Sequence, residues 1–223
     1  MRKLVIISSV LIVAIIIYTT ISTWNMEMTF RQKLLRSVYP VFTALGRLTG
    51  AHAETRINEH KAKPGTPVFD IPVIMNDGSV KKLSEFAGKK IMIVNTASDC
   101  GYTRQFDDLQ KLYEQESGKL VIIGFPSNDF KEQEKGSDAE IEAYCRRNYG
   151  VTFPLAQKSK VSKGEGQHAI YQWLSSKEKN GWNSKSPSWN FSKYLINEQG
   201  VLTHYFDPAV DPVGKEILKA IQL

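Results

Sequence analysis

Apolar and polar positions along the chain predict a compact α/β unit from residue 67 onward. Two continuous apolar runs, at 91–94 and 120–123, are typical of buried strands in a parallel sheet. Apolar residues at helical spacing predict helices over 102–116 and 138–147. The other expected elements are a β-hairpin from 68–73 and 80–83, a strand pair at 191–196 and 201–206 across the turn 197–200, and a last helix opened by Pro212 and ending near Gln222.

The N-terminal part has a different pattern. Leu4 to Ser22 is a run of nineteen residues without a charge, preceded by Arg2 and Lys3. At about 1.5 Å per residue this run nearly matches a bilayer core of about 30 Å, so we expect a single transmembrane anchor within residues 1–23. A cleaved signal peptide has a shorter apolar region, of about 7–15 residues. If translation started at Met26 or Met28, the chain would contain no transmembrane span.

Residues 24–66 are expected to be a basic juxtamembrane helix and a linker. Apolar residues at helical spacing over 30–48, with four basic residues between them, favour either an amphipathic helix on an anionic membrane surface or a solvated helix. Residues 49–66 lack periodicity and end in Pro64-Gly65, which is typical of a linker. The short basic tail before the anchor favours a domain outside the cytoplasm, although basic residues on both sides leave the cytoplasmic side open.

The charge distribution does not indicate a nucleic acid as a partner. Residues 1–64 hold nine Lys/Arg and three Asp/Glu, whereas the rest of the chain holds 20 of each sign. The basic character therefore belongs to the N-terminal segment and does not predict nucleic-acid binding. The two cysteines lie 45 residues apart and the four histidines are scattered, so we expect neither a disulfide scaffold nor a metal site or other cofactor.

Cys100 is the strongest candidate for chemistry. It follows a predicted buried strand and a short polar turn, and it precedes a predicted helix. Unpaired backbone N–H groups and the helix dipole at such a position favour a thiolate over a thiol. The alternative is a small buried apolar side chain, which is the commonest fate of a lone cysteine.

Four sequence blocks resemble the glutathione peroxidase family, in its order and spacing. They lie within residues 68–223 and read Val-Asn-Thr-Ala-Ser-Asp-Cys-Gly-Tyr-Thr from Val94, Phe-Pro-Ser-Asn-Asp-Phe from Phe125, Tyr-Gly-Val-Thr-Phe-Pro from Tyr149, and Trp-Asn-Phe-Ser-Lys-Tyr-Leu from Trp189. The predicted order, a βαβ unit, a hairpin and a closing helix, is that of the thioredoxin fold. We therefore expect an α/β thioredoxin-like domain over 67–223, with a central mixed sheet flanked by helices and the N-terminal transmembrane helix before it.

The resemblance implies roles for individual residues. Cys100 stands at the position of the peroxidatic residue, and Trp189 and Asn190 match the pair that the family places beside it. The family's fourth member is a glutamine, and this chain has Asp129 there. An ionised carboxylate cannot donate a hydrogen bond to a thiolate. Asp129 therefore faces away, or is protonated, or leaves the donor role to Asn128.

Cys145 falls where thioredoxin-dependent members of the family keep a resolving cysteine. The alternative is a core cysteine on a helix. Arg146 and Arg147 beside it would favour a thiolate and so a resolving role. Forming a disulfide with Cys100 requires Cα atoms within about 7 Å, so the 138–147 helix is expected to loosen.

The resemblance implies a thiol peroxidase that acts in the response to oxidative stress. It would reduce hydrogen peroxide and organic or lipid hydroperoxides through a cysteine sulfenic acid, with thioredoxin or glutathione as the reductant. The alternative is a membrane-tethered redox sensor with little turnover.

A thiol-disulfide oxidoreductase would need CxxC, and a copper-delivery protein would need CxxxC. The relevant positions hold Thr103 and Arg104.

Overall fold

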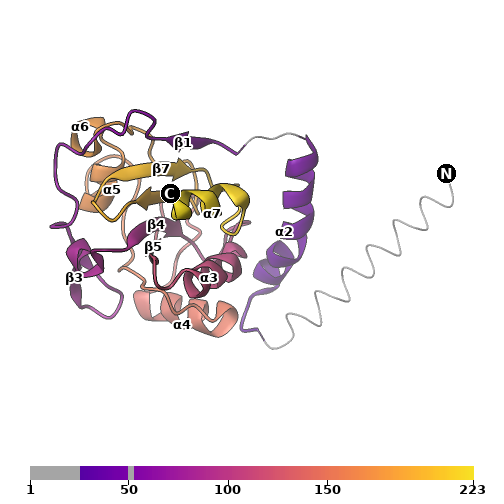
Figure 1. Cartoon of the computed structure of the whole chain (residues 1–223). Helices are drawn as coiled ribbons and strands as arrows, with labels where there is room; N and C mark the ends of the chain where they lie inside the picture. The colour runs from indigo at the N-terminus through magenta and orange to yellow at the C-terminus, as the bar shows by residue number, and fades with distance from the viewer. Residues whose placement is uncertain (1–25, 50–52) are drawn as a thin grey trace.

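A computed structural model describes residues 26–49 and 53–223 of the chain (Figure 1). The predicted anchor at Leu4–Ser22 lies outside the described residues. Among the helices of 26–49 and 53–223, none is both long and apolar enough to cross a bilayer.

A five-stranded mixed sheet forms the centre of the domain, with strand order β1-β7-β6-β4-β5. Strands β4 and β5 run parallel, β6 is antiparallel to β4, and β7 is antiparallel to both β6 and β1. The strands are β1 (Thr55–Ile57), β4 (Lys90–Thr96), β5 (Leu120–Pro126), β6 (Lys193–Ile196) and β7 (Leu202–Phe206). This mixed sheet flanked by helices confirms the predicted thioredoxin-like α/β domain.

Apolar residues on both faces of the sheet build two core layers. Successive side chains of a strand point to opposite faces, so Met92 and Val94 join one cluster while Ile91 and Ile93 join the other. Helices α3 (Gln105–Gln115), α4 (Asp138–Tyr149) and α7 (Lys215–Gln222) contribute to the first cluster. The second is covered by the hairpin β2 (Pro72–Ile74) and β3 (Val80–Lys82), the 3-10 turn η1 (Leu83–Phe86) and α5 (Ala169–Leu174), with α6 (Lys177–Asn180) following α5.

Several element boundaries differ from the sequence predictions, and three of the differences have a clear structural cause. The first hairpin strand covers only Pro72–Ile74, because residues 68–71 form a turn in which the Ile71 amide donates to the Val68 carbonyl. The last helix begins at Lys215 rather than at Pro212, because Gly214 first closes a turn onto the Asp211 carbonyl. Part of the expected linker is strand β1, since residues 55–57 pair with β7.

The predicted amphipathic helix is present as α2 (Phe30–Thr49) and stands beside the domain, on the side of α3 and α4 (Figure 1). Tyr39 is buried and meets the Tyr102 ring edge-on, with ring centres 6.2 Å apart. The Gln32 amide donates to the Ser98 carbonyl at 3.1 Å. One face of α2 therefore contacts the loop that carries Cys100.

Candidate active site

Cys100 lies in the turn that joins β4 to α3, where it is almost fully buried. Its backbone N–H donates to the Thr103 hydroxyl oxygen at 2.9 Å, and that hydroxyl donates to the Ala97 carbonyl at 2.9 Å. The Tyr102 backbone N–H points at the Cys100 sulfur, 3.4 Å away. Thr103 thus fixes the turn so that a backbone donor faces the thiol, a positioning role that the sequence analysis did not assign to it.

The turn that carries Trp189 and Asn190 is held by the same strand that leads to Cys100. Asn95, near the end of β4, donates its side-chain amide to the Trp189 carbonyl at 3.0 Å. Its own carbonyl accepts from the Phe191 N–H at 2.6 Å. Phe191 has a φ of 69°, a left-handed conformation that a bulky residue adopts only when the surrounding contacts impose it. The structure therefore brings Cys100, Trp189 and Asn190 together from distant parts of the sequence.

Opposing effects set the protonation of Cys100. Burial raises the pKa of its thiol above the ordinary value, and the negative charge of Asp99 adds to this. Hydrogen bonds from the Tyr102 amide and from the Trp189 and Asn190 side chains act in the opposite direction and stabilise the thiolate. Burial has the largest effect, so the pKa of Cys100 is raised although the residue lies at the start of a helix.

Gln133 and Glu134 are two further polar residues at the site whose roles sequence reasoning missed. Asn190 donates its side-chain amide to Gln133 Oε1 at 2.9 Å, and the Gln133 carbonyl accepts from the Asp99 N–H at 3.0 Å. Glu134 is fully buried and accepts a hydrogen bond from the Ser98 hydroxyl. Both residues come shortly after the block that begins at Phe125 and resembles the family, and this closeness was the one signal that could have marked them.

Asp129 is turned toward another part of the chain. Its Oδ2 accepts from the backbone N–H groups of Val161 and Ser162, each at 2.7 Å. Asn128 uses its side-chain oxygen to accept from the Glu134 N–H at 2.9 Å. Of the three sequence alternatives for Asp129, this geometry corresponds to the one in which the carboxylate faces away from Cys100.

Cys145 lies on α4, fully buried, and belongs to the same apolar cluster as Cys100. Both cysteines are free thiols. Burial raises the pKa of Cys145 well above its ordinary value, and the charges of Glu134 and Glu142 raise it further. Arg146 lowers the pKa of Cys145, as its position beside the cysteine predicts, but burial has the larger effect. Arg146 also pairs with Glu142, and Arg147 pairs with Glu27 on the protein surface.

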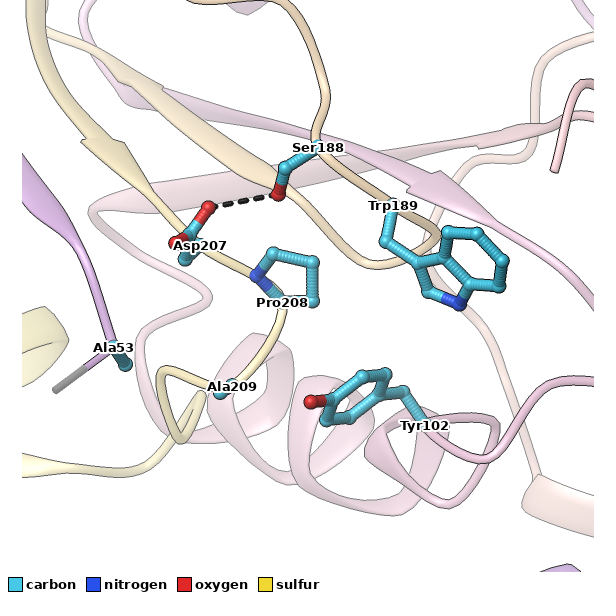
Figure 2. Close-up of a pocket in the computed structure, with 7 residues that line it drawn as sticks. All are labelled: Ala53, Tyr102, Ser188, Trp189, Asp207, Pro208 and Ala209. Atoms are coloured by element: carbon cyan, nitrogen blue, oxygen red, sulfur yellow. Dashed lines mark hydrogen bonds between the residues drawn. The ribbon is translucent and has the colours of Figure 1, made fainter. Parts of the chain in front are cut away.

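A pocket of about 480 Å³ opens beside Trp189. Figure 2 shows the Trp189 indole at the right of the pocket, the Tyr102 ring below it and Pro208 at the left. Its polar wall is the Ser188 hydroxyl, which donates to the Asp207 carboxylate at 2.8 Å. Ala53 and Ala209 complete the lining. The pocket thus offers mainly apolar contacts next to the residues that surround Cys100.

The described part of the chain holds no group of three or more His, Cys, Asp or Glu side chains placed to bind a metal ion. At the candidate site, the Cys100 thiol accepts hydrogen bonds from the donors around it.

Comparison with known proteins agrees with this arrangement. The sequence profile of the glutathione peroxidase family matches residues 68–175. A glutathione peroxidase of Lactococcus lactis subsp. cremoris is 42% identical over 149 residues, which cover 66% of this chain and 94% of that protein. The glutathione peroxidase homolog BsaA of Bacillus subtilis is 40% identical over 159 residues, covering 70% of this chain and 98% of the homolog.

Solved structures share the fold. The crystal structure of Trgpx in apo form has a TM-score of 0.54 and 32% identity, over 71% of this chain and 97% of its own. The crystal structure of T. cruzi GPX1 has a TM-score of 0.52 and 27% identity, over 70% and 97%. The chain thus belongs to the glutathione peroxidase family of peroxidase enzymes.

Proposed function

We propose that the chain reduces hydrogen peroxide and organic hydroperoxides, lipid hydroperoxides among them, through a sulfenic acid on Cys100. The observation that carries this proposal is the set of donors on the sulfur, from the Tyr102 backbone and the Trp189 and Asn190 side chains. These donors stabilise the thiolate, which is the form that attacks peroxides. They also lie where negative charge moves from sulfur to the departing oxygen.

The first step consumes one hydroperoxide. The Cys100 thiolate attacks the terminal oxygen, a sulfur–oxygen bond forms, and the oxygen–oxygen bond breaks with its electron pair on the departing oxygen. That oxygen takes a proton and leaves as water or an alcohol, and the sulfur becomes a sulfenic acid. The apolar pocket between Tyr102 and Trp189 suits the hydrocarbon part of an organic hydroperoxide.

The second step returns Cys100 to the thiol. We propose that Cys145 condenses with the sulfenic acid to form a disulfide, which thioredoxin then reduces. The segment before α4 supports this, because Lys131 and Glu132 both have a φ of 52°, a left-handed conformation that costs free energy in non-glycine residues. Stored strain at this point favours the loosening of α4 that the disulfide requires. Direct reduction of the sulfenic acid by glutathione is the competing route.

We also propose that the N-terminal segment tethers the enzyme to a membrane as a single-pass protein. The supporting observation is the outward face of α2, where Phe30, Leu34 and Val38 follow each other at four-residue spacing with exposed fractions of 83%, 51% and 37%. An apolar stripe next to the basic residue Lys33 suits the surface of an anionic bilayer. The uncharged run Leu4–Ser22 precedes it in the sequence. The charge pattern favours a catalytic domain outside the cytoplasm.

The recycling route is tested by steady-state peroxide reduction with thioredoxin against glutathione, in the unaltered chain and in Cys145→Ser. The proposal expects turnover with thioredoxin that the variant loses, while the first peroxide equivalent is still consumed. Full thioredoxin turnover in Cys145→Ser would contradict the resolving role of Cys145 and would favour the one-cysteine route.

The alternative function, a redox sensor, uses the same residues but differs in rate. A sensor would react with one equivalent of peroxide and form the disulfide, yet turn over poorly with every soluble reductant. The membrane proposal is tested separately by extraction of the full chain. It expects release by detergent only, and quantitative recovery in a high-salt wash without detergent would contradict it.

A further inference from the structure

Glu134 is a buried acid that the proposed mechanism does not yet use. It lies between β5 and α4 with no exposed surface. Its N–H donates to the Asn128 side chain, and its Oε1 accepts from the Ser98 hydroxyl. Its Oε2 is buried and has no hydrogen-bond partner within the described residues. An unpaired buried carboxylate oxygen is costly, and such groups call for an explanation.

The surroundings of Glu134 leave it able to exchange a proton near neutral pH. Burial raises the pKa of its carboxyl to about 7, against hydrogen bonds from Ser98 and the positive charge of Lys158. The Lys158 ammonium is itself bound to the Gly136 carbonyl at 2.5 Å, and the nearby Asp99 carboxylate is paired with Arg31. The groups of α4 that sense the charge of Glu134 are Tyr144 and Cys145.

Cys145 needs a proton acceptor if it is to resolve the sulfenic acid. A thiol attacks only as its thiolate, and burial holds Cys145 in the thiol form. The two other charged groups that act on it, Glu142 and Arg146, form an ion pair with each other on the surface of α4. Glu134 is therefore a buried acid whose charge acts on Cys145 and whose Oε2 has no hydrogen-bond partner within the described residues.

We propose that Glu134 accepts the Cys145 proton and returns it to the oxygen that leaves Cys100 during disulfide formation. This inference rests on the proposed resolving role of Cys145. The Cys145 thiol gives its proton to the Glu134 carboxylate, and the sulfur attacks the Cys100 sulfenic sulfur. The sulfur–sulfur bond forms as the sulfur–oxygen bond breaks. The departing hydroxide takes the proton from Glu134 and leaves as water, so Glu134 ends as it began and no other reactant is needed.

Glu134→Gln separates this role from a purely electrostatic one, because the two predict effects of opposite sign. The negative charge of Glu134 raises the pKa of Cys145. If charge were its only influence, removing it would increase the thiolate fraction and speed disulfide formation. If Glu134 is the proton acceptor, its removal slows that step by about 10²-fold or more, as for other general bases. Glu142→Gln is the matched control, because Glu142 raises the same pKa but is paired with Arg146 on the surface.

The experiment is a single-turnover reaction of the full-length chain with one equivalent of peroxide. Sulfenic acid is followed by trapping and the Cys100–Cys145 disulfide by mass spectrometry, from pH 5 to about pH 10.5. We expect the disulfide-forming rate of the unaltered chain to rise with pH to a plateau, with a midpoint near 7. Glu134→Gln is expected to form sulfenic acid normally, to form the disulfide slowly and to lose that midpoint, while Glu142→Gln keeps it.

Two results would overturn the inference. One is disulfide formation in Glu134→Gln that is as fast as, or faster than, in the unaltered chain. The other needs no variant: a rate in the unaltered chain that rises only above pH 9 would show that the thiol ionises without an acceptor of this kind. Absence of any Cys100–Cys145 disulfide in the unaltered chain is a different failure, because it removes the proposed resolving role and the inference with it.

Discussion

Arg36 holds its guanidinium carbon 4.6 Å from the centre of the Tyr149 ring, and the same group pairs with the Asp107 carboxylate at 2.8 Å. One side chain of α2 thereby joins the last residue of α4 to the first turn of α3. Because α4 carries Cys145, the helix outside the family domain is linked to the element that has to loosen for a disulfide to form.

Arg36→Ala is expected to weaken the docking of α2 on α4. A partly buried cation–π contact and an ion pair contribute on the order of 1 kcal/mol each, so amide exchange in the two helices should speed up by about 30-fold. Hydrogen–deuterium exchange with mass spectrometry measures this. Lys33→Ala is the control, since no ion pair or side-chain hydrogen bond of Lys33 is found among the described residues. Equal exchange in both variants would show that Arg36 does not hold the helices together.

Asp129→Gln restores the residue type that the glutathione peroxidase family carries at this position. Because the Asp129 carboxylate accepts from the Val161 and Ser162 N–H groups, we expect the longer side chain to lose these bonds. The cost should be about 1–3 kcal/mol of unfolding free energy, with no gain in peroxidase rate. Chemical denaturation and peroxide kinetics measure the two effects. Asp129→Asn, which keeps one acceptor oxygen, is the control. A faster peroxidase without loss of stability would show instead that this position belongs to the catalytic site.

Asn190→Ala removes a donor to the Cys100 sulfur and a partner of Gln133. Since the hydrogen bond lowers the pKa of Cys100, its loss should shift the pH midpoint of Cys100 alkylation upward. The rate of peroxide reduction at neutral pH should fall by about 10–10³-fold. Alkylation kinetics against pH, followed by mass spectrometry of the Cys100 peptide, measure the midpoint. Ser188→Ala is the control for the midpoint, because Ser188 is exposed in the same turn and bonds to Asp207. An unchanged midpoint in Asn190→Ala would contradict the donor role.

The sequence predicted the elements that depend on local pattern. The buried run at 91–94 and the polar turn after it placed Cys100 between a strand and a helix, as β4 and α3 confirm. Strand β1 was missed because a three-residue strand has no periodicity of its own. It forms because residues 55–57 find partners in β7, far along the chain.

The chemistry around the cysteines was harder to predict. Glu134 lies in a polar run, and acids in such runs are mostly exposed, so its complete burial could not be read from its neighbours. The partners of Asp129 are backbone groups at positions 161 and 162, which only the folded chain brings to it. Arg146 and Arg147 adjoin Cys145 in sequence, but their side chains leave the helix toward the surface. In each case, the surroundings of the side chain in the folded protein could not be predicted from its neighbours in the sequence.

The most direct test of the account is the reaction of Cys100 itself. Ser is nearly the same size as Cys, so Cys100→Ser should keep the fold, as judged by circular dichroism and thermal unfolding. Peroxide consumption by the full-length chain should then fall to the uncatalysed rate, and no sulfenic acid should be trapped, whereas the unaltered chain yields one sulfenic acid or one disulfide per peroxide. Peroxide turnover by a folded Cys100→Ser variant would contradict the account, because the nucleophile would then lie elsewhere.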